Sequence, residues 1–156
     1  MNSASPPAAA TAASGSPAAR LADRLTALVS HGTLALANRV GIGAVFLLSG
    51  RTKVEGWLSV TDGALALFRD EYRLPLIAPE IAAHAAAYAE HLFPLMLFLG
   101  LGTRCAALAL LGMTATIQLF VYPDAWPTHL TWAAALLYLA GRGGGPLSLD
   151  RWLGLR

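Results

Sequence analysis

The chain has 156 residues, of which 56% are apolar and 13% charged, and its formal net charge is +2. Because soluble globular domains carry nearly twice this share of charge, about a quarter, the composition favours a membrane protein. Scattered basic residues exclude a nucleic-acid partner, and a single cysteine, Cys105, excludes an intrachain disulfide or a CxxC redox pair.

The first part of the chain lacks the features of a membrane span. Residues 1–20 are predicted to be a disordered tail, because the first nineteen are mostly small residues and prolines and carry no charge. They lack the basic start and the apolar run of a signal peptide. In residues 21–32, Leu21, Leu25 and Leu28 recur at helical spacing. This segment is either an interfacial helix or the start of the first span.

The rest of the chain has room for four membrane-spanning helices. A helix needs about 20 mainly apolar residues to cross the hydrocarbon core. Spans are predicted at about 33–50, 78–101, 105–121 and 126–140. The polar stretch between the first two spans holds a mildly apolar piece, 64–68, suited to an interfacial or re-entrant helix. The prediction is therefore an all-α membrane protein with a four-transmembrane-helix bundle over residues 33–141.

The distribution of basic residues predicts the orientation. Loops on the cytoplasmic side of a membrane retain an excess of Lys and Arg. One face of the predicted bundle collects six of them and the other face four: Arg20, Arg24, Arg104, Arg142, Arg151 and Arg156 against Arg51, Lys53, Arg69 and Arg73. Both termini are therefore expected in the cytoplasm. Residues 142–156 then form a cytoplasmic tail, in which Ser148 would cap a short helix.

Arg39 is the most informative polar residue, because it lies within the first predicted span. An arginine there costs about 2.5–3.5 kcal/mol and usually faces the bundle interior, where it finds a partner. Glu90, in the middle of the second span, is the predicted partner. The alternatives are that Arg39 reaches the cytoplasmic headgroups and that Glu90 bonds to a hydroxyl.

Other polar side chains also fall in or near the spans. His129 follows Trp126 and precedes Trp132, a grouping that suits either a membrane anchor or a quinone headgroup site. Gln118 either bonds to another helix or donates to a ligand carbonyl. His84 and His91 are too far apart along one helix to chelate a metal alone, so no metal site is predicted. The candidate polar intramembrane cluster comprises Arg39, Lys53, Glu90, His91, Gln118 and His129, with no catalytic residue assigned.

Several stretches resemble the DoxX family of small bacterial membrane proteins. The first is Arg39-Val-x-Ile-Gly43-x-x-Phe46-x-x-Ser49-Gly50-x-x-Lys53. The others are Ala89-Glu90-His91-x-x-Pro94-Leu95, Leu99-Gly100-Leu101-Gly102-Thr103-Arg104, Trp126-Pro127-Thr128-His129-Leu130-x-Trp132 and Gly145-Pro146-Leu147-Ser148-Leu149-Asp150. The resemblance covers about residues 33–152. It implies a four-helix protein of the bacterial inner membrane.

The resemblance also implies a role in redox chemistry. The namesake subunits of the family belong to a thiosulfate:quinone oxidoreductase, and other members are described with membrane redox or thiol-stress complexes. The leading hypothesis is an inner-membrane subunit of a quinone-linked or thiol/sulfur-linked oxidoreductase, with quinone as the candidate cofactor. Its expected partners are the lipid bilayer and either another protein or further copies of the chain. The alternative is a non-catalytic anchor or assembly factor. A transporter ranks last, because the two predicted hairpins show no internal repeat.

Overall fold

The computed structural model describes residues 16–155, which divide into two units with a boundary after Ser30. The greater part of the predicted N-terminal tail, residues 1–15, lies outside the described residues. Within the described part of the first unit, α1 (Pro17–Leu28) is capped by Ser16, whose hydroxyl accepts a hydrogen bond from the Ala19 amide. The helix starts four residues before the predicted segment 21–32, and none of its residues is buried.

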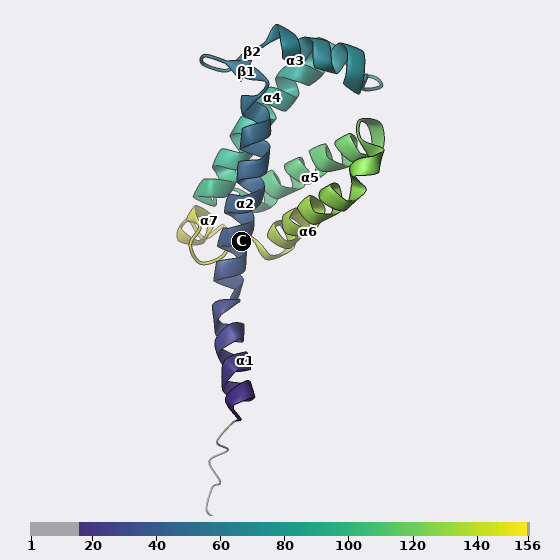
Figure 1. Cartoon of the computed structure of the whole chain (residues 1–156). Coiled ribbons are helices and arrows are strands. Elements are labelled where there is room, and N and C mark those ends of the chain that lie inside the picture. Colours follow the sequence, from purple (N-terminus) through teal and green to yellow (C-terminus); the bar gives the residue numbers. More distant parts are fainter. Residues whose placement is uncertain (1–15, 156) are drawn as a thin grey trace, which may run out of the picture. The chain divides into compact units, whose positions relative to one another are not determined.

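The second unit contains four long helices: α2 (His31–Arg51), α4 (Pro79–Leu99), α5 (Thr103–Phe120) and α6 (Trp126–Arg142). Each coincides with a predicted span to within two residues at either end. The most extensive contacts join α2 to α4 and α5 to α6 (Figure 1). The predicted fold class is confirmed in its main feature, because the described residues are nearly all helical, with one two-stranded hairpin as the exception. Of the described helices, α2 and α5 are both long and apolar enough to cross a membrane.

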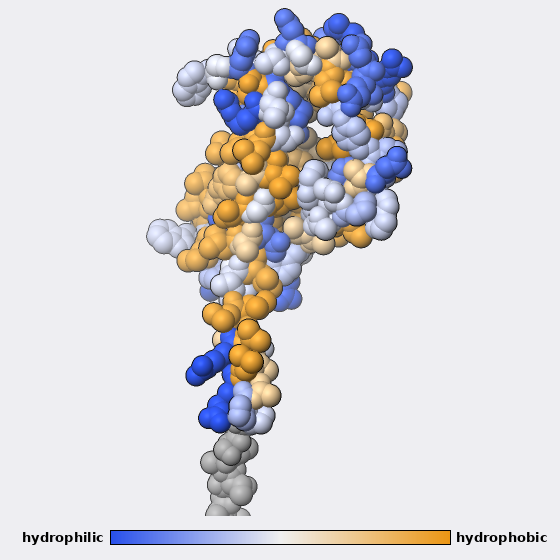
Figure 2. All heavy atoms as spheres, viewed as in Figure 1, coloured by the Kyte–Doolittle hydropathy of each residue, from blue (hydrophilic) through white to orange (hydrophobic). Residues whose placement is uncertain are grey.

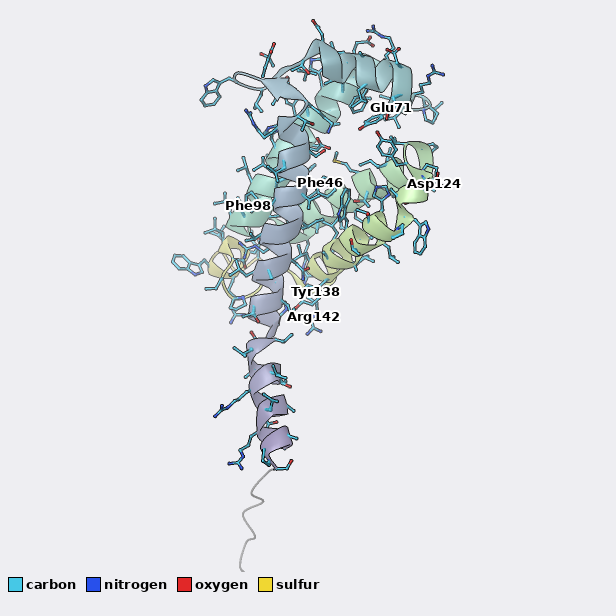
Figure 3. The ribbon with its side chains drawn as sticks, in the orientation of Figure 1. Phe46, Glu71, Phe98, Asp124, Tyr138 and Arg142 are labelled. Carbon is cyan, nitrogen blue, oxygen red and sulfur yellow. The ribbon has the colours of Figure 1, made fainter. Side chains whose placement is uncertain are left out.

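The core of the bundle is built from small and aliphatic side chains. Its buried members are Ala35, Ile42, Phe46, Leu97, Ala106, Ala107, Leu110, Leu136 and Leu139. Glycines of α2 let α4 approach closely, since a Cβ on Gly43 would lie 2.7 Å from the ring of Phe98. A Cβ on Gly50 would lie 2.9 Å from Cβ of Glu90. Phe98 is seen beside α2 in Figure 3. The groove of small residues therefore serves helix packing.

The segment between α2 and α4 is more structured than predicted. It contains a hairpin of β1 (Val54–Glu55) and β2 (Ser59–Val60), then α3 (Asp62–Leu67) and the π-helix η1 (Phe68–Tyr72). The strands are antiparallel, with Val54 opposite Val60. Strands of two residues are too short to show hydrophobic alternation, so no sequence pattern predicts them. Phe68 packs with Ala82 and Ala83 in a second small core, which fixes η1 over the start of α4.

Tight turns close the other end of the bundle. Gly100 and Gly102, both with positive φ, connect α4 to α5 as the sequence predicts. The last helix, α7 (Leu149–Trp152), is capped by the Ser148 hydroxyl, which accepts from the Arg151 amide, so this predicted cap is confirmed. Asp150 accepts from the amides of Gly102 and Thr103 at 2.6 and 2.9 Å. The tail is thereby fixed to the start of α5.

Candidate binding cavity

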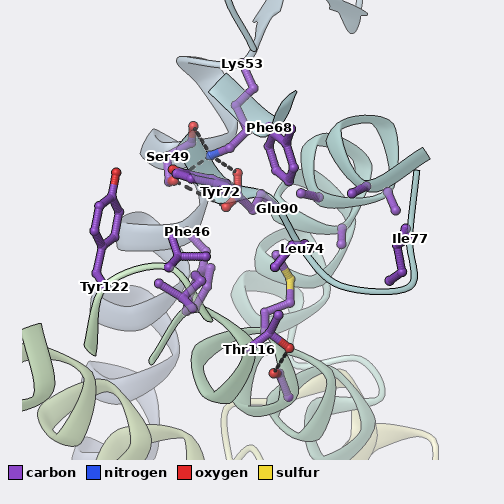
Figure 4. Close-up of a pocket in the computed structure, with 18 of the residues that line it drawn as sticks. Phe46, Ser49, Lys53, Phe68, Tyr72, Leu74, Ile77, Glu90, Thr116 and Tyr122 are labelled. Carbon is purple, nitrogen blue, oxygen red and sulfur yellow. Dashed lines mark hydrogen bonds and ion pairs between the residues drawn. The ribbon is translucent and has the colours of Figure 1, made fainter. Parts of the chain in front are cut away.

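A cavity of about 550 Å³ lies in the second unit, bounded by α2, η1, α4, α5 and α6. Most of its wall is apolar or aromatic, with Phe46, Phe68, Tyr72 and Trp132 among the rings. The polar groups on the wall are few: Ser49, Lys53, Tyr72, Glu90, Thr116, Tyr122 and His129. Figure 4 shows the polar cluster of Ser49, Lys53 and Glu90 at one end of the cavity.

Lys53 and Glu90 form a buried ion pair in the cavity wall. Nζ of Lys53 lies 2.7 Å from Oε2 of Glu90, and the two side chains are 7% and 4% exposed. The same Nζ donates to Oγ and the carbonyl oxygen of Ser49, at 3.0 and 3.3 Å. The Ser49 hydroxyl donates to Oε1 of Glu90 at 3.3 Å. These bonds occupy all three donors of the ammonium group, so both charges are compensated inside the protein.

The predicted Arg39–Glu90 ion pair is wrong. Arg39 lies eleven residues, or about 16 Å of helix, before Gly50, the α2 residue that packs on Glu90. Its guanidinium donates to four backbone carbonyl oxygens: Leu97 at 2.6 Å, Phe98 at 2.7 Å, Leu147 at 2.7 Å and Gly144 at 3.1 Å. The side chain is buried and joins the end of α4 to the C-terminal tail. Its role in this arrangement is structural.

His129 presents one free ring nitrogen at the cavity. Nδ1 lies 2.7 Å from Oε1 of Gln118, whose Nε2 donates to the Pro123 carbonyl at 2.7 Å. Since that carbonyl can only accept, the Gln118 amide directs its oxygen at His129, and Nδ1 must carry the proton. Nε2 of neutral His129 is then an acceptor, and it has no hydrogen-bond partner within residues 16–155. Trp132 lies against the ring, with centroids 5.2 Å apart.

The remaining predicted residues take different places. Gln118 supports His129 from behind, whereas His91 packs at the α2–α4 interface beside Gly50. Nδ1 of His91 donates to the Ala87 carbonyl at 2.7 Å. Its Nε2 is buried and unpartnered among the described residues. The structure thus brings Lys53, Glu90 and His129 to the cavity and leaves Arg39 and His91 outside its wall.

Sequence reasoning missed the tyrosines of this cavity. Tyr72 of η1 and Tyr122 after α5 meet edge to face, with ring centroids 5.8 Å apart. The Tyr122 hydroxyl donates to Oε1 of Glu71, and that hydrogen bond raises the pKa of Tyr122 above its ordinary value. Burial raises the pKa of Tyr72. The two tyrosines are fifty residues apart in the chain. Each lies next to or near an acidic residue, and this is the one sequence feature that could have indicated them.

Within residues 16–155, no group of three or more His, Cys, Asp or Glu side chains is placed to hold a metal ion. The cavity instead suits an organic ligand that is mostly apolar. A model of the DoxX family matches residues 34–123, which include three of the five cavity-bounding elements in full, η1, α4 and α5, and all but the first three residues of α2. No curated protein and no solved structure matches the chain.

Proposed function

The chain belongs to the DoxX family of integral membrane proteins, and from this premise we propose that it is a subunit of a quinone-linked or thiol/sulfur-linked oxidoreductase in the bacterial inner membrane. In this proposal the cavity binds the quinone. A partner protein oxidises the sulfur or thiol substrate, and its electrons pass to the quinone.

The proposed topology has four crossings, by α2, α4, α5 and α6, with both termini in the cytoplasm. Exposed hydrophobic side chains cover the middle of the second unit, while hydrophilic ones gather around β1, β2 and α3 (Figure 2). A membrane-embedded belt explains why large side chains such as Leu48, Leu119 and Leu137 are 58–69% exposed. The 17 residues of α6 span about 25 Å, enough for most of the hydrocarbon core.

The observation that carries the quinone proposal is the cavity itself. Its volume of about 550 Å³ lies within the range of small-molecule sites, roughly 300–1,000 Å³. Aromatic side chains would stack on a flat ring. Nε2 of His129 accepts a hydrogen bond from a hydroquinone hydroxyl and, when protonated, donates one to a quinone carbonyl. The ammonium group of Lys53 has no spare donor for a quinone carbonyl. In this proposal the Lys53–Glu90 pair therefore makes the wall polar and does not bind the quinone directly.

Tryptophan fluorescence offers a direct test. Trp132 lines the cavity, whereas Trp57 is 98% exposed at the tip of the β1–β2 hairpin. A ubiquinone or menaquinone analogue added to the purified chain in detergent should quench Trp132 with saturation. Quenching should be lost in Trp132→Phe and kept in Trp57→Phe.

Two results together would reject quinone binding. One is equal, non-saturating quenching in both variants. The other is a thermal midpoint of the quinone-free protein that does not move when the analogue is added.

The alternative function is a non-catalytic anchor or assembly factor. It is favoured by one observation, namely that Arg39 is satisfied by backbone carbonyls and does not face the cavity. Under this alternative, His129→Ala would leave the activity of the assembled complex unchanged. Under the quinone proposal the same variant lowers the complex's quinone turnover while the amount of assembled complex stays the same.

A further inference from the structure

A second hollow, of about 590 Å³, lies where the starts of α2 and α5 meet the end of α6 and the C-terminal tail. It is lined largely by polar residues and glycines. Three arginines come to it from separate elements, Arg104 from α5, Arg142 from α6 and Arg151 from α7. Their positive charges converge on one site only in the folded chain.

These arginines retain free hydrogen-bond donors. Nη1 of Arg104 donates to the carbonyls of Ala140 and Gly141 at 2.7 and 2.8 Å, which leaves its Nε and Nη2 unbonded among residues 16–155. The side chains of Arg142 and Arg151 are exposed and make no hydrogen bond or ion pair within the same residues. The hollow therefore offers unpaired guanidinium groups.

The carboxylate at this hollow is already hydrogen-bonded within the protein. Asp150 is the one acidic residue among its described lining, and both of its carboxylate oxygens accept from amides at the start of α5. That carboxylate lies at the positive end of α5, and within residues 16–155 it forms no ion pair with Arg104, Arg142 or Arg151. An anion with several oxygens would meet both the charge and the donors, because the arginine fork matches phosphate oxygens.

We propose that this hollow binds a phosphate group, carried by the headgroup of an anionic phospholipid or present as free phosphate. Basic pockets between membrane helices bind phospholipid headgroups by this chemistry. The inference does not depend on quinone binding, because the hollow and the cavity share no lining residue.

Native mass spectrometry of the delipidated full chain tests the proposal. The probes are phosphatidylglycerol, zwitterionic phosphatidylcholine and inorganic phosphate alone, each added in detergent. The charge variant is Arg142→Gln/Arg151→Gln. The control is Arg51→Gln/Arg69→Gln, which removes the same charge from exposed positions outside the hollow.

We expect phosphatidylglycerol to bind the wild-type chain more tightly than phosphatidylcholine does. Its affinity should fall about tenfold in Arg142→Gln/Arg151→Gln and stay within about twofold in the control. Competition by inorganic phosphate would identify an anion site open to free phosphate, and binding of the lipid without such competition would assign the site to the headgroup. The proposal is overturned if the two lipids bind alike and phosphate does not bind, or if both double variants lose affinity equally.

Discussion

The stability of the buried charges on Lys53 and Glu90 depends on their pairing with each other. Each side chain is nearly inaccessible, and each satisfies the other through a 2.7 Å contact supported by Ser49. Removing one charge strands the other in a poorly solvated wall, whereas removing both removes the need for compensation.

We therefore predict that Glu90→Gln lowers the free energy of unfolding by about 3–5 kcal/mol. The double variant Lys53→Met/Glu90→Leu should be less destabilised than Glu90→Gln, because no unpaired charge remains. Denaturant titration of the purified chain in detergent measures both. A double variant destabilised as much as Glu90→Gln, or more, would show that the cost of Glu90→Gln does not come from an unpaired charge on Lys53.

Arg39, unlike Lys53 and Glu90, forms no ion pair within residues 16–155. Its guanidinium donates hydrogen bonds to backbone carbonyls of two distant segments, the end of α4 and the C-terminal tail. Arg39→Lys keeps the charge but loses the planar fork, so we predict a loss of about 1–3 kcal/mol in unfolding free energy. Tryptic cleavage after Arg142 and Arg151 should also accelerate, because the tail is released. Cleavage at the wild-type rate would contradict the role assigned to Arg39.

At the scale of elements, the cavity depends on the placement of η1 against the end of α5. The Tyr122–Glu71 hydrogen bond and the Tyr72–Tyr122 ring contact join the two segments. Because Glu71 accepts from the neutral phenol, ionisation of Tyr122 would place two negative charges in contact. The contact between η1 and the end of α5 therefore depends on Tyr122 remaining protonated.

The sign of the pH effect follows from the raised pKa of Tyr122. The stabilisation is fully present below the unfolded tyrosine value, about pH 10, and is lost as pH rises through the folded value. We predict that Glu71→Gln makes Tyr122 ionise at lower pH in an absorbance titration of tyrosinate. Tyr122→Phe is the control, since it deletes that titration; an unchanged titration in Glu71→Gln would exclude the bond.

For the whole molecule, the two ends of the second unit differ in chemistry. One end carries the cavity's polar groups, η1 and the β-hairpin, and the other carries Arg39, the arginine-lined hollow and the tail. The proposed topology puts the second end in the cytoplasm, in line with the excess of basic residues there. Cys105, which is free and exposed near the start of α5, reports on this end.

We predict that a membrane-impermeant maleimide labels Cys105 in inverted inner-membrane vesicles and leaves it unlabelled in intact spheroplasts. The matched control is Cys105→Ser/Trp57→Cys, which moves the thiol to the exposed tip of the β1–β2 hairpin and should show the opposite pattern. The two positions are separated by one proposed span, α4. Labelling of both from the same side would show that α4 does not cross the membrane and would refute the proposed topology.

The sequence by itself determined the helices of this protein. Apolar runs of span length, Pro at helix starts and Gly at the α4–α5 turn are local signals, and they located four helices to within two residues. It also singled out Glu90 and His129, because polar groups in apolar segments are costly wherever they lie. Lys53 stood out as the last residue of the family pattern in the first span and the turn after it. The family pattern drew on the same local residues.

Only the tertiary structure decided which of these groups meet. Antiparallel packing of α2 on α4 brings Glu90 beside Gly50 and within reach of Lys53, and it brings Arg39 to the carbonyls at the end of α4. A backbone carbonyl leaves no mark in the sequence, so a predicted partner for Arg39 had to be a side chain. The cavity and the arginine-lined hollow likewise draw on segments far apart in the chain, and their existence depends on how those segments pack.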